Sequence, residues 1–326
     1  MSKMMKTRVV GVDIEIDVTT YAIVDIRGTI IAIDHFSTSD YPIVSEYVAV
    51  LSDKIVTLVE ANGGYDTVRS VGISAPSGNF LTGSIENAAN LPWKGIIPLA
   101  ALMRDSLGLA VAVGNDAHVT AIGERVYGSA HGLQNFVVVS MGHGGVGSCF
   151  FSNGRAHLGD SGSAGEIGHI CVEDHGRLCG CGRQGCLERY VSVGGLIQTA
   201  REILAESSED SLMRQLPELT LEAIGQCCDE GDKLALEVYR QTGEMFGIGL
   251  SFYASVINPE AIILTGGLTN QWKWLEEPTQ LSFNEHLFPN LRGKVELQVS
   301  IITDAERDVM GASALAWEVE EYSLFI

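Results

Sequence analysis

The sequence lacks any apolar run of eighteen or more residues, and its N-terminus has no apolar stretch followed by a cleavage signature. These absences predict neither a membrane-spanning helix nor a secretory signal peptide. No low-complexity linker or heptad tract divides the chain. We therefore expect a cytoplasmic globular protein without a membrane partner.

Positive charge is also scarce. The chain holds 21 Lys and Arg residues against 41 Asp and Glu residues, which gives a formal net charge of −20. Because the acids are spread along the chain, a surface that follows a nucleic-acid backbone would be repelled by the phosphates. We expect no nucleic-acid partner, and solubility suffices to explain the charge.

Cysteine is present in an odd number, seven, and three of the seven fall within eight positions. The spacing Cys179-x-Cys181-x4-Cys186, with His169 upstream, is better explained by metal binding than by disulfides. Three thiolates and one imidazole form the ligand set of a closed, tetrahedral structural zinc site. The competing interpretation is that His169 is an ordinary core residue. A closed site has no open position, so a zinc hydrolase is not expected.

The hydrophobic pattern predicts an α/β protein of two lobes, because 326 residues exceed what one core usually serves. A strand pair with a turn near residue 14 and another near residue 144 suggest a duplicated lobe with a cleft between the copies. We expect a small lobe over residues 1–115, completed by a C-terminal helix within 308–326, and a large lobe over 116–307. The predicted strands are 8–13, 19–24, 29–35, 68–74, 110–113, 136–140, 148–152 and 261–264, and the predicted helices are 44–59, 117–127, 193–206, 220–230, 233–257 and 308–320.

Asp116 follows the predicted strand 110–113 and begins a predicted helix. An aspartate oriented by nearby backbone amides can take the proton from a substrate hydroxyl during phosphoryl transfer. Aspartate is also a preferred helix N-cap. Its position alone leaves both roles open.

Two glycine-rich turns follow strands, at Gly142-His143-Gly144 and at Gly266-Gly267. A backbone without side chains can bring its amides close to phosphate oxygens. Turns of this composition also occur without a ligand, so the spacing leaves both interpretations open.

Glu166 and Glu188 flank the predicted metal loop. A carboxylate accepts hydrogen bonds from adjacent hydroxyls, as a sugar presents them. The alternative is that both are solvated acids. A metal site that makes the loop beside them rigid favours the sugar-binding interpretation.

Together these motifs resemble the ROK family, a bacterial group of sugar kinases and sugar-responsive repressors in the hexokinase and actin superfamily, and within it the glucokinase-like proteins. The resemblance spans nearly the whole chain. Its most specific parts are residues 114–117 (GNDA), 164–169 (AGEIGH) and 179–188 (CGCGRQGCLE), and its supporting parts are residues 77–80, 89–93, 258–267 and 311–314.

The resemblance implies a two-lobed hexokinase/actin-like (ribonuclease H-like) fold with a cleft for sugar and ATP, and a homodimer. It implies that Asp116 is the base for the sugar 6-hydroxyl, that Asp13 helps to hold Mg²⁺, and that structural Zn²⁺ binds the four residues above. The hexose would be lined by Gly78, Asn79, Asn115, Asp116, Glu166, His169 and Glu188, and ATP would contact Gly142, His143, Gly144, Gly266 and Gly267.

The first phosphate loop departs from the family pattern. Where the family has Ile-Gly-Gly-Thr-Lys after its aspartate, this chain has Ile14-Glu15-Ile16-Asp17-Val18. Glycine lets the backbone approach phosphate, whereas Glu15 and Asp17 add side chains and negative charge. In the second loop, His143 replaces the threonine of the usual Gly-Thr-Gly.

Two functions follow from this pattern. The first is ATP-dependent phosphorylation of a hexose at the 6-hydroxyl, as in a glucokinase. The alternative is a regulatory or sensory sugar-binding ROK protein with weak or no kinase activity. The winged-helix domain of the family's repressors is not expected, since the first strand begins by Arg8. The sequence does not identify the hexose.

Overall fold

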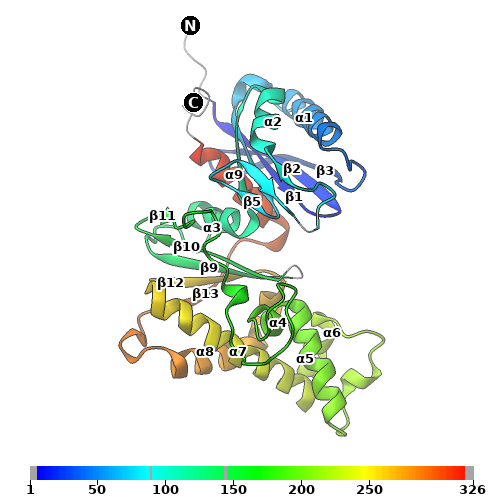
Figure 1. Cartoon of the computed structure of the whole chain (residues 1–326), viewed down its shortest axis with the longest axis vertical. Coiled ribbons are helices and arrows are strands. Elements are labelled where there is room, and N and C mark those ends of the chain that lie inside the picture. The colour runs from blue at the N-terminus through cyan, green and yellow to red at the C-terminus, as the bar shows by residue number, and fades with distance from the viewer. Residues whose placement is uncertain (1–5, 89, 143–144, 320–326) are drawn as a thin grey trace. The chain divides into compact units, whose positions relative to one another are not determined.

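The computed structural model describes residues 6–88, 90–142 and 145–319, which form two compact units (Figure 1). One unit contains the described residues up to Gly132, Leu158–Ala164, and the described residues from Ile301 onward. The other contains Leu133–His157 and Gly165–Ser300. The sequence analysis placed a boundary between residues 115 and 116. The structure instead groups helix α3 (Asp116–Tyr127) with the first unit, because α3 packs against the C-terminal helix α9 (Asp304–Glu318).

The first unit is built on a mixed five-stranded sheet with the order β3-β2-β1-β4-β8. β1 pairs antiparallel with β2 and parallel with β4, and β4 pairs parallel with β8. The carboxyl ends of β1, β4 and β8 therefore lie at one edge of the sheet. The strands are β1 (Arg8–Ile14), β2 (Val18–Asp25), β3 (Ile30–Ser37), β4 (Val68–Ala75) and β8 (Ala110–Asn115), and a small sheet adds β5 (Gly78–Asn79), β6 (Ser84–Glu86) and β7 (Ile96–Ile97).

The two faces of β1 contact different helices because successive side chains of a strand point to opposite faces. Val10 and Val12 belong to the core that includes residues of α1 (Val44–Ala61) and α2 (Leu99–Leu107), whereas Val9 packs with residues of α9. Gly11 allows close approach on the α9 face, since a Cβ atom there would lie 2.4 Å from the carbonyl oxygen of Val309. Asp13 is the next residue on this face.

Like the first unit, the second unit is built on a five-stranded sheet that contains an antiparallel hairpin. Its strand order is β11-β10-β9-β12-β13. β9 pairs antiparallel with β10 and parallel with β12. The strands are β9 (Phe136–Gly142), β10 (Gly145–Ser152), β11 (Arg155–Ala156), β12 (Ala261–Thr265) and β13 (Glu296–Val299), and the helices are α4 (Glu188–Val191), α5 (Val193–Glu206), α6 (Leu221–Asp229), α7 (Lys233–Ile257) and α8 (Trp272–His286).

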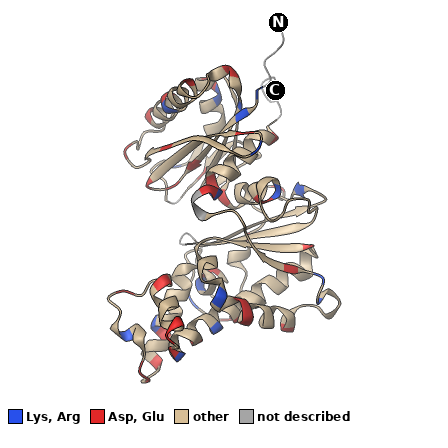
Figure 2. Cartoon of the chain, turned by 180° about the vertical axis from the view of Figure 1, so that it is seen from behind, with Lys and Arg blue, Asp and Glu red and all other residues tan. Residues whose placement is uncertain are grey.

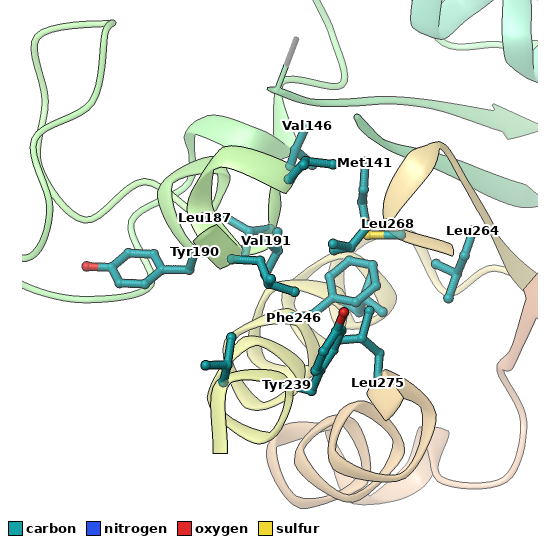
Figure 3. Close-up of a cluster of buried hydrophobic side chains, with 14 of the residues drawn as sticks. Met141, Val146, Leu187, Tyr190, Val191, Tyr239, Phe246, Leu264, Leu268 and Leu275 are labelled. Carbon is teal, nitrogen blue, oxygen red and sulfur yellow. The ribbon is translucent and has the colours of Figure 1, made fainter. Parts of the chain in front are cut away.

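The core of the second unit joins this sheet to its helices (Figure 3). Met141 and Val146 of the hairpin lie with Leu187, with Phe246 of α7 and with Leu275 of α8. α7 and α8 pack closely because glycines of α7 face α8. A Cβ atom on Gly247 would lie 2.5 Å from the backbone nitrogen of Phe283.

The predicted strands and helices are confirmed within a few residues. The elements that were not predicted are the helices α2, α4 and α8 and the strands β5, β6, β7, β11 and β13. Of these, α8 contains Pro278, a residue that usually interrupts a helix. Acidic side chains are spread over both units (Figure 2). Among the described residues, none of the helices combines the length and apolarity that a membrane span requires.

Candidate functional site

Residues predicted for the site fall into two groups, one in each unit. In the first unit they lie at the carboxyl ends of β1, β4 and β8. The register places Asp13 opposite Ser74, and Ala75 opposite Asn115. Asp13 and Asp116 are close enough for the charge of Asp116 to contribute to a raised pKa at Asp13.

Asp116 begins α3 directly after β8. Asn115 is the N-cap, and its Oδ1 accepts a hydrogen bond from the Ala117 amide at 3.0 Å. The Asp116 Oδ1 accepts from the same amide at 2.8 Å. Asp116 keeps an exposed surface, although surrounding protein raises the pKa of its carboxyl and the Ala117 amide opposes that rise. The cap is thus Asn115, and Asp116 presents its carboxylate at the sheet edge.

Gly78 and Asn79 form β5, which lies close to the end of β8. A Cβ atom on Gly78 would lie 2.4 Å from the Gly114 carbonyl oxygen, so glycine permits this approach. The Asn79 Nδ2 donates to the Ser161 carbonyl oxygen at 3.1 Å. Asn79 therefore holds the segment that leads into residues 164–169.

A group of three carboxylates lies at the end of β1, where the sequence analysis expected the first phosphate loop. Oxygens of Asp13, Glu15 and Asp308 all lie within 4.8 Å of one another. Burial, followed by the charge of Asp308, raises the pKa of Asp13, while a hydrogen bond from Ser74 opposes this. Burial also raises the pKa of Asp308 to about 6, with Arg307 opposing and Glu15 contributing. Oxygen ligands of this kind suit a hard divalent cation such as Mg²⁺.

Asp308 is a member of this group that the sequence analysis missed. It comes from α9, and no local pattern indicates that α9 meets the end of β1. The only signal was Gly11, whose missing side chain lets α9 approach. Asp17, which was expected to share the loop with Glu15, is exposed and is not in this group.

In the second unit, the four predicted metal ligands come together. Side-chain ligand atoms of the four lie within 4.8 Å of one another. The Cys181 and Cys186 sulfurs are 3.7 Å apart, and the Cys179 sulfur lies 3.7 Å from His169 Nδ1. Two sulfurs that are each about 2.3 Å from a tetrahedral zinc would be separated by about 3.8 Å. The geometry and the donor set therefore fit zinc.

Glu188 is held between this cluster and the glycine-rich hairpin. Its Oε1 lies 3.8 Å from the Cys179 sulfur, and its Oε2 accepts a hydrogen bond from the Val146 amide at 3.2 Å. Gly145 permits the contact, since a Cβ atom there would lie 2.1 Å from Oε2. Glu188 also lies two residues after Cys186, so a metal that fixes Cys186 would restrain the backbone that carries Glu188.

The segment containing Glu166 lies directly against β10. Cβ atoms on Gly165 and Gly168 would lie 2.4 Å and 2.2 Å from the carbonyl oxygens of Ser148 and Val146. The Ser148 hydroxyl donates to the Gly165 carbonyl oxygen and contacts the Tyr253 hydroxyl of α7 at 2.8 Å. Glu166 itself is exposed next to the short helix Ile167–His169.

The predicted nucleotide-binding glycines meet at the edge of the second sheet. Gly142 ends β9, and Gly266 follows β12, which is parallel to β9. Gly266 has φ +95°, and a Cβ atom there would lie 2.4 Å from the Met141 carbonyl oxygen. Gly267 begins a short helix, Gly267–Gln271. His143 and Gly144 lie outside the described residues.

Comparison with known proteins agrees with these features. The sequence pattern of the ROK family matches residues 9–319. A glucokinase of Halalkalibacterium halodurans is 31% identical over 257 residues, which cover 77% of this chain and 76% of that protein. The DNA-binding transcriptional dual regulator NagC of Escherichia coli is 30% identical over 203 residues, which cover 62% of this chain and 49% of that regulator.

Among solved structures, a ROK family glucokinase from Streptomyces griseus in complex with glucose and AMPPNP has a TM-score of 0.76 and 27% identity. The match covers 96% of this chain and 100% of that one. The fold is the two-lobed, actin-like α/β fold of ROK sugar kinases. Since the pattern covers nearly the whole chain and glucokinases are among its relatives, this protein belongs to the ROK family as a glucokinase-like member.

Proposed function

We propose that this protein binds a hexose and transfers a phosphoryl group from ATP to the sugar 6-hydroxyl. The observation that carries the proposal is Asp116 at the end of β8, oriented by the Ala117 amide and beside Asp13. A base and a metal-binding carboxylate at one strand edge are the two protein groups that phosphoryl transfer requires. The glucose and AMPPNP bound to the Streptomyces griseus relative support both substrates.

The residues have separate roles in this proposal. Asn79, Asn115, Glu166, His169 and Glu188 orient the hexose by accepting and donating hydrogen bonds to its hydroxyls. Asp116 takes the proton from the 6-hydroxyl, so that the oxygen can attack the terminal phosphate. Mg²⁺, when bound at Asp13, neutralises negative charge on the transferred group.

In this proposal the zinc cluster stabilises the sugar site and does not contact the reacting atoms. The metal would close the loop through four protein ligands, His169, Cys179, Cys181 and Cys186, and would leave no open coordination position. Its contribution is to hold Glu188 against the Val146 amide.

The proposal is tested by a coupled ADP-release assay with a panel of hexoses. Replacing Asp116 by Asn keeps the shape of the side chain and removes the base. We expect turnover to fall by about 10²-fold or more, as is typical when a general base is lost. Hexose affinity, measured by calorimetry, should change little. Turnover that survives Asp116→Asn would remove Asp116 from this role.

A second candidate is a sugar-responsive protein with little phosphoryl transfer. The three carboxylates of Asp13, Glu15 and Asp308 favour it. Two like unit charges about 5 Å apart repel by about 3 kcal/mol at an effective dielectric constant of about 20. ATP would therefore bind weakly unless a cation is present to offset the carboxylates. The similarity to NagC, a transcriptional regulator, is consistent with such a role.

Calorimetry with ATP separates the two candidates. The titration is run with and without Mg²⁺, each with and without glucose. Tight binding of MgATP together with ADP release supports the kinase. Glucose binding without ATP binding at millimolar concentrations supports the sugar-responsive protein.

A further inference from the structure

A fourth cysteine lies next to the metal cluster and is not one of its ligands. Cys171 follows His169 by two positions, and its side chain is exposed, whereas Cys186 is buried. Its sulfur does not belong to the group of four ligand atoms. Cys171 is therefore a solvent-accessible thiol beside the predicted zinc site.

The backbone pairs Cys171 with Cys186. The two residues form an isolated antiparallel bridge. The Val172 amide donates to the Gly185 carbonyl oxygen and the Leu187 amide donates to the Ile170 carbonyl oxygen, both at 2.9 Å. Because these bonds flank Cys171 and Cys186, the two cysteines form a non-hydrogen-bonded pair. Their Cα atoms are then about 4.5 Å apart and their side chains leave the same face of the ribbon.

This spacing suits a disulfide, in which Cα atoms are usually about 4.4–6.8 Å apart. Each sulfur currently faces another neighbour. The Cys186 sulfur lies 3.7 Å from that of Cys181, and the Cys171 sulfur lies 3.5 Å from the Glu173 carbonyl oxygen. Gly185 leaves room beside Cys171, since a Cβ atom there would lie 3.1 Å from its sulfur. Rotation about the two Cα–Cβ bonds would bring the sulfurs together without moving the backbone.

We propose that Cys171 and Cys186 form a reversible disulfide when a hydroperoxide oxidises the loop, and that this oxidation releases the metal. The Cys171 thiolate attacks the peroxide, the O–O bond breaks, a sulfenic acid forms and an alcohol, or water from hydrogen peroxide, leaves. The Cys186 sulfur then attacks the Cys171 sulfur, and the S–O oxygen leaves as water. In total, two thiols and one hydroperoxide give one disulfide, one alcohol and one water.

The disulfide consumes one of the four metal ligands. A disulfide sulfur is no longer a thiolate, so only His169, Cys179 and Cys181 would remain to hold the ion. Glu188 follows Cys186 closely and contacts the Cys179 sulfur. Oxidation should therefore loosen Glu188. This last effect rests on the proposed hexose-binding function, whereas disulfide formation and metal release do not.

The test treats the zinc-loaded full chain with hydrogen peroxide, follows zinc with a chromogenic chelator, and maps disulfides by mass spectrometry after alkylation. Trypsin cleavage after Arg177 and Arg183 places Cys171, Cys186 and the other two cysteine ligands on three different peptides. We expect about one zinc released per chain, together with a Cys171–Cys186 peptide. Dithiothreitol and added zinc should restore the starting state.

The matched variants are Cys171→Ser and Cys171→Ala, which leave all four metal ligands in place. Both should bind about one zinc when reduced, as we expect of the wild type, and peroxide should release it at least about tenfold more slowly than from the wild type. Equal rates of release, or a peptide joining Cys186 to Cys179 or Cys181 in place of Cys171, would overturn the proposal.

Hexose affinity is measured in the same samples. We expect oxidised wild type to bind the hexose more weakly than the reduced protein, with no such loss in Cys171→Ser. If the reduced protein binds no hexose, the proposed function fails, while the zinc and peptide measurements still decide the disulfide.

Discussion

At the scale of single residues, Asp308 shows how a distant side chain changes a local site. It projects from α9 to the end of β1, where its carboxylate meets those of Asp13 and Glu15. Burial raises the pKa of Asp308 to about 6, above the 3.8 of an ordinary aspartate. The folded protein therefore binds a proton at Asp308 more readily than the unfolded chain does. The charged form of Asp308 opposes folding.

This predicts that Asp308→Asn stabilises the protein near neutral pH. Since the pKa is raised by folding, the wild type loses stability as pH rises from about 4 to about 6, and the loss is complete above that range. Two pKa units correspond to about 3 kcal/mol, so we expect the variant to gain about 1–3 kcal/mol in unfolding free energy at pH 7.5. Urea denaturation of the variant and the wild type measures this difference.

The gain should shrink to about 0.5 kcal/mol at pH 4, because Asp308 is then protonated in the folded protein and only about half ionised in the unfolded chain. Asp66→Asn is the control, since Asp66 is exposed and outside the carboxylate group. It should change stability by less than about 0.5 kcal/mol at either pH. A gain from Asp308→Asn that is the same at pH 4 and pH 7.5 would contradict the explanation by charge.

At the scale of helices and strands, the packing of α7 on α8 depends on glycine. A Cβ atom on Gly247 would meet backbone atoms of α8, which cannot move aside as the end of a flexible side chain can. We expect Gly247→Ala to lower the free energy of unfolding by about 1–3 kcal/mol, because the two helices would have to separate. Urea denaturation monitored by circular dichroism gives the value.

Gly194→Ala is the matched control for this prediction. Gly194 lies in α5, and the atom nearest to a Cβ there is the Ser192 hydroxyl at 4.0 Å. Alanine favours a helix over glycine, so this variant should gain up to about 1 kcal/mol. The explanation by close packing fails if both substitutions change the free energy of unfolding in the same direction.

The elements that sequence could predict are those whose pattern is local. Strand β1 and helix α7 have clear apolar periodicity, and His169 and the three cysteine ligands lie within a short segment. α8 was missed because Pro278 interrupts the expected pattern. Asp308 and the Cys171–Cys186 pairing were missed because both depend on which distant backbones approach each other. Gly11 and Gly185 permit those approaches, but a glycine in the sequence does not indicate which distant segment packs against it.

At the scale of the whole molecule, the two units differ in the interactions that hold their segments in place. The first unit has two buried clusters on the faces of one sheet, and these include residues of α1, α2 and α9. In the second unit, the segment from residue 165 to residue 187 has only a short helix, Ile167–His169, and isolated bridges. This segment has little regular backbone pairing of its own, so we infer that the metal supplies much of its order.

We therefore predict that removing zinc loosens this segment and leaves the first unit unchanged. A chelator would remove the ion that we propose to join His169 to the three cysteines, and the thiolates, once protonated, would no longer hold the loop closed. Amide hydrogen exchange in residues 170–187 should then accelerate by at least about tenfold, because opening no longer breaks metal bonds. Peptides from β1 and β4 should exchange at their original rate.

Adding zinc back is the control for this experiment, and it should restore slow exchange in residues 170–187. Hexose affinity should follow the exchange, since Glu188 lies two residues after the metal ligand Cys186 and accepts a hydrogen bond from the Val146 amide. A chelated protein whose loop stays protected would show that packing alone orders the segment. In that case, Glu188 would keep its place without the metal, and the metal would have no structural role at the proposed sugar site.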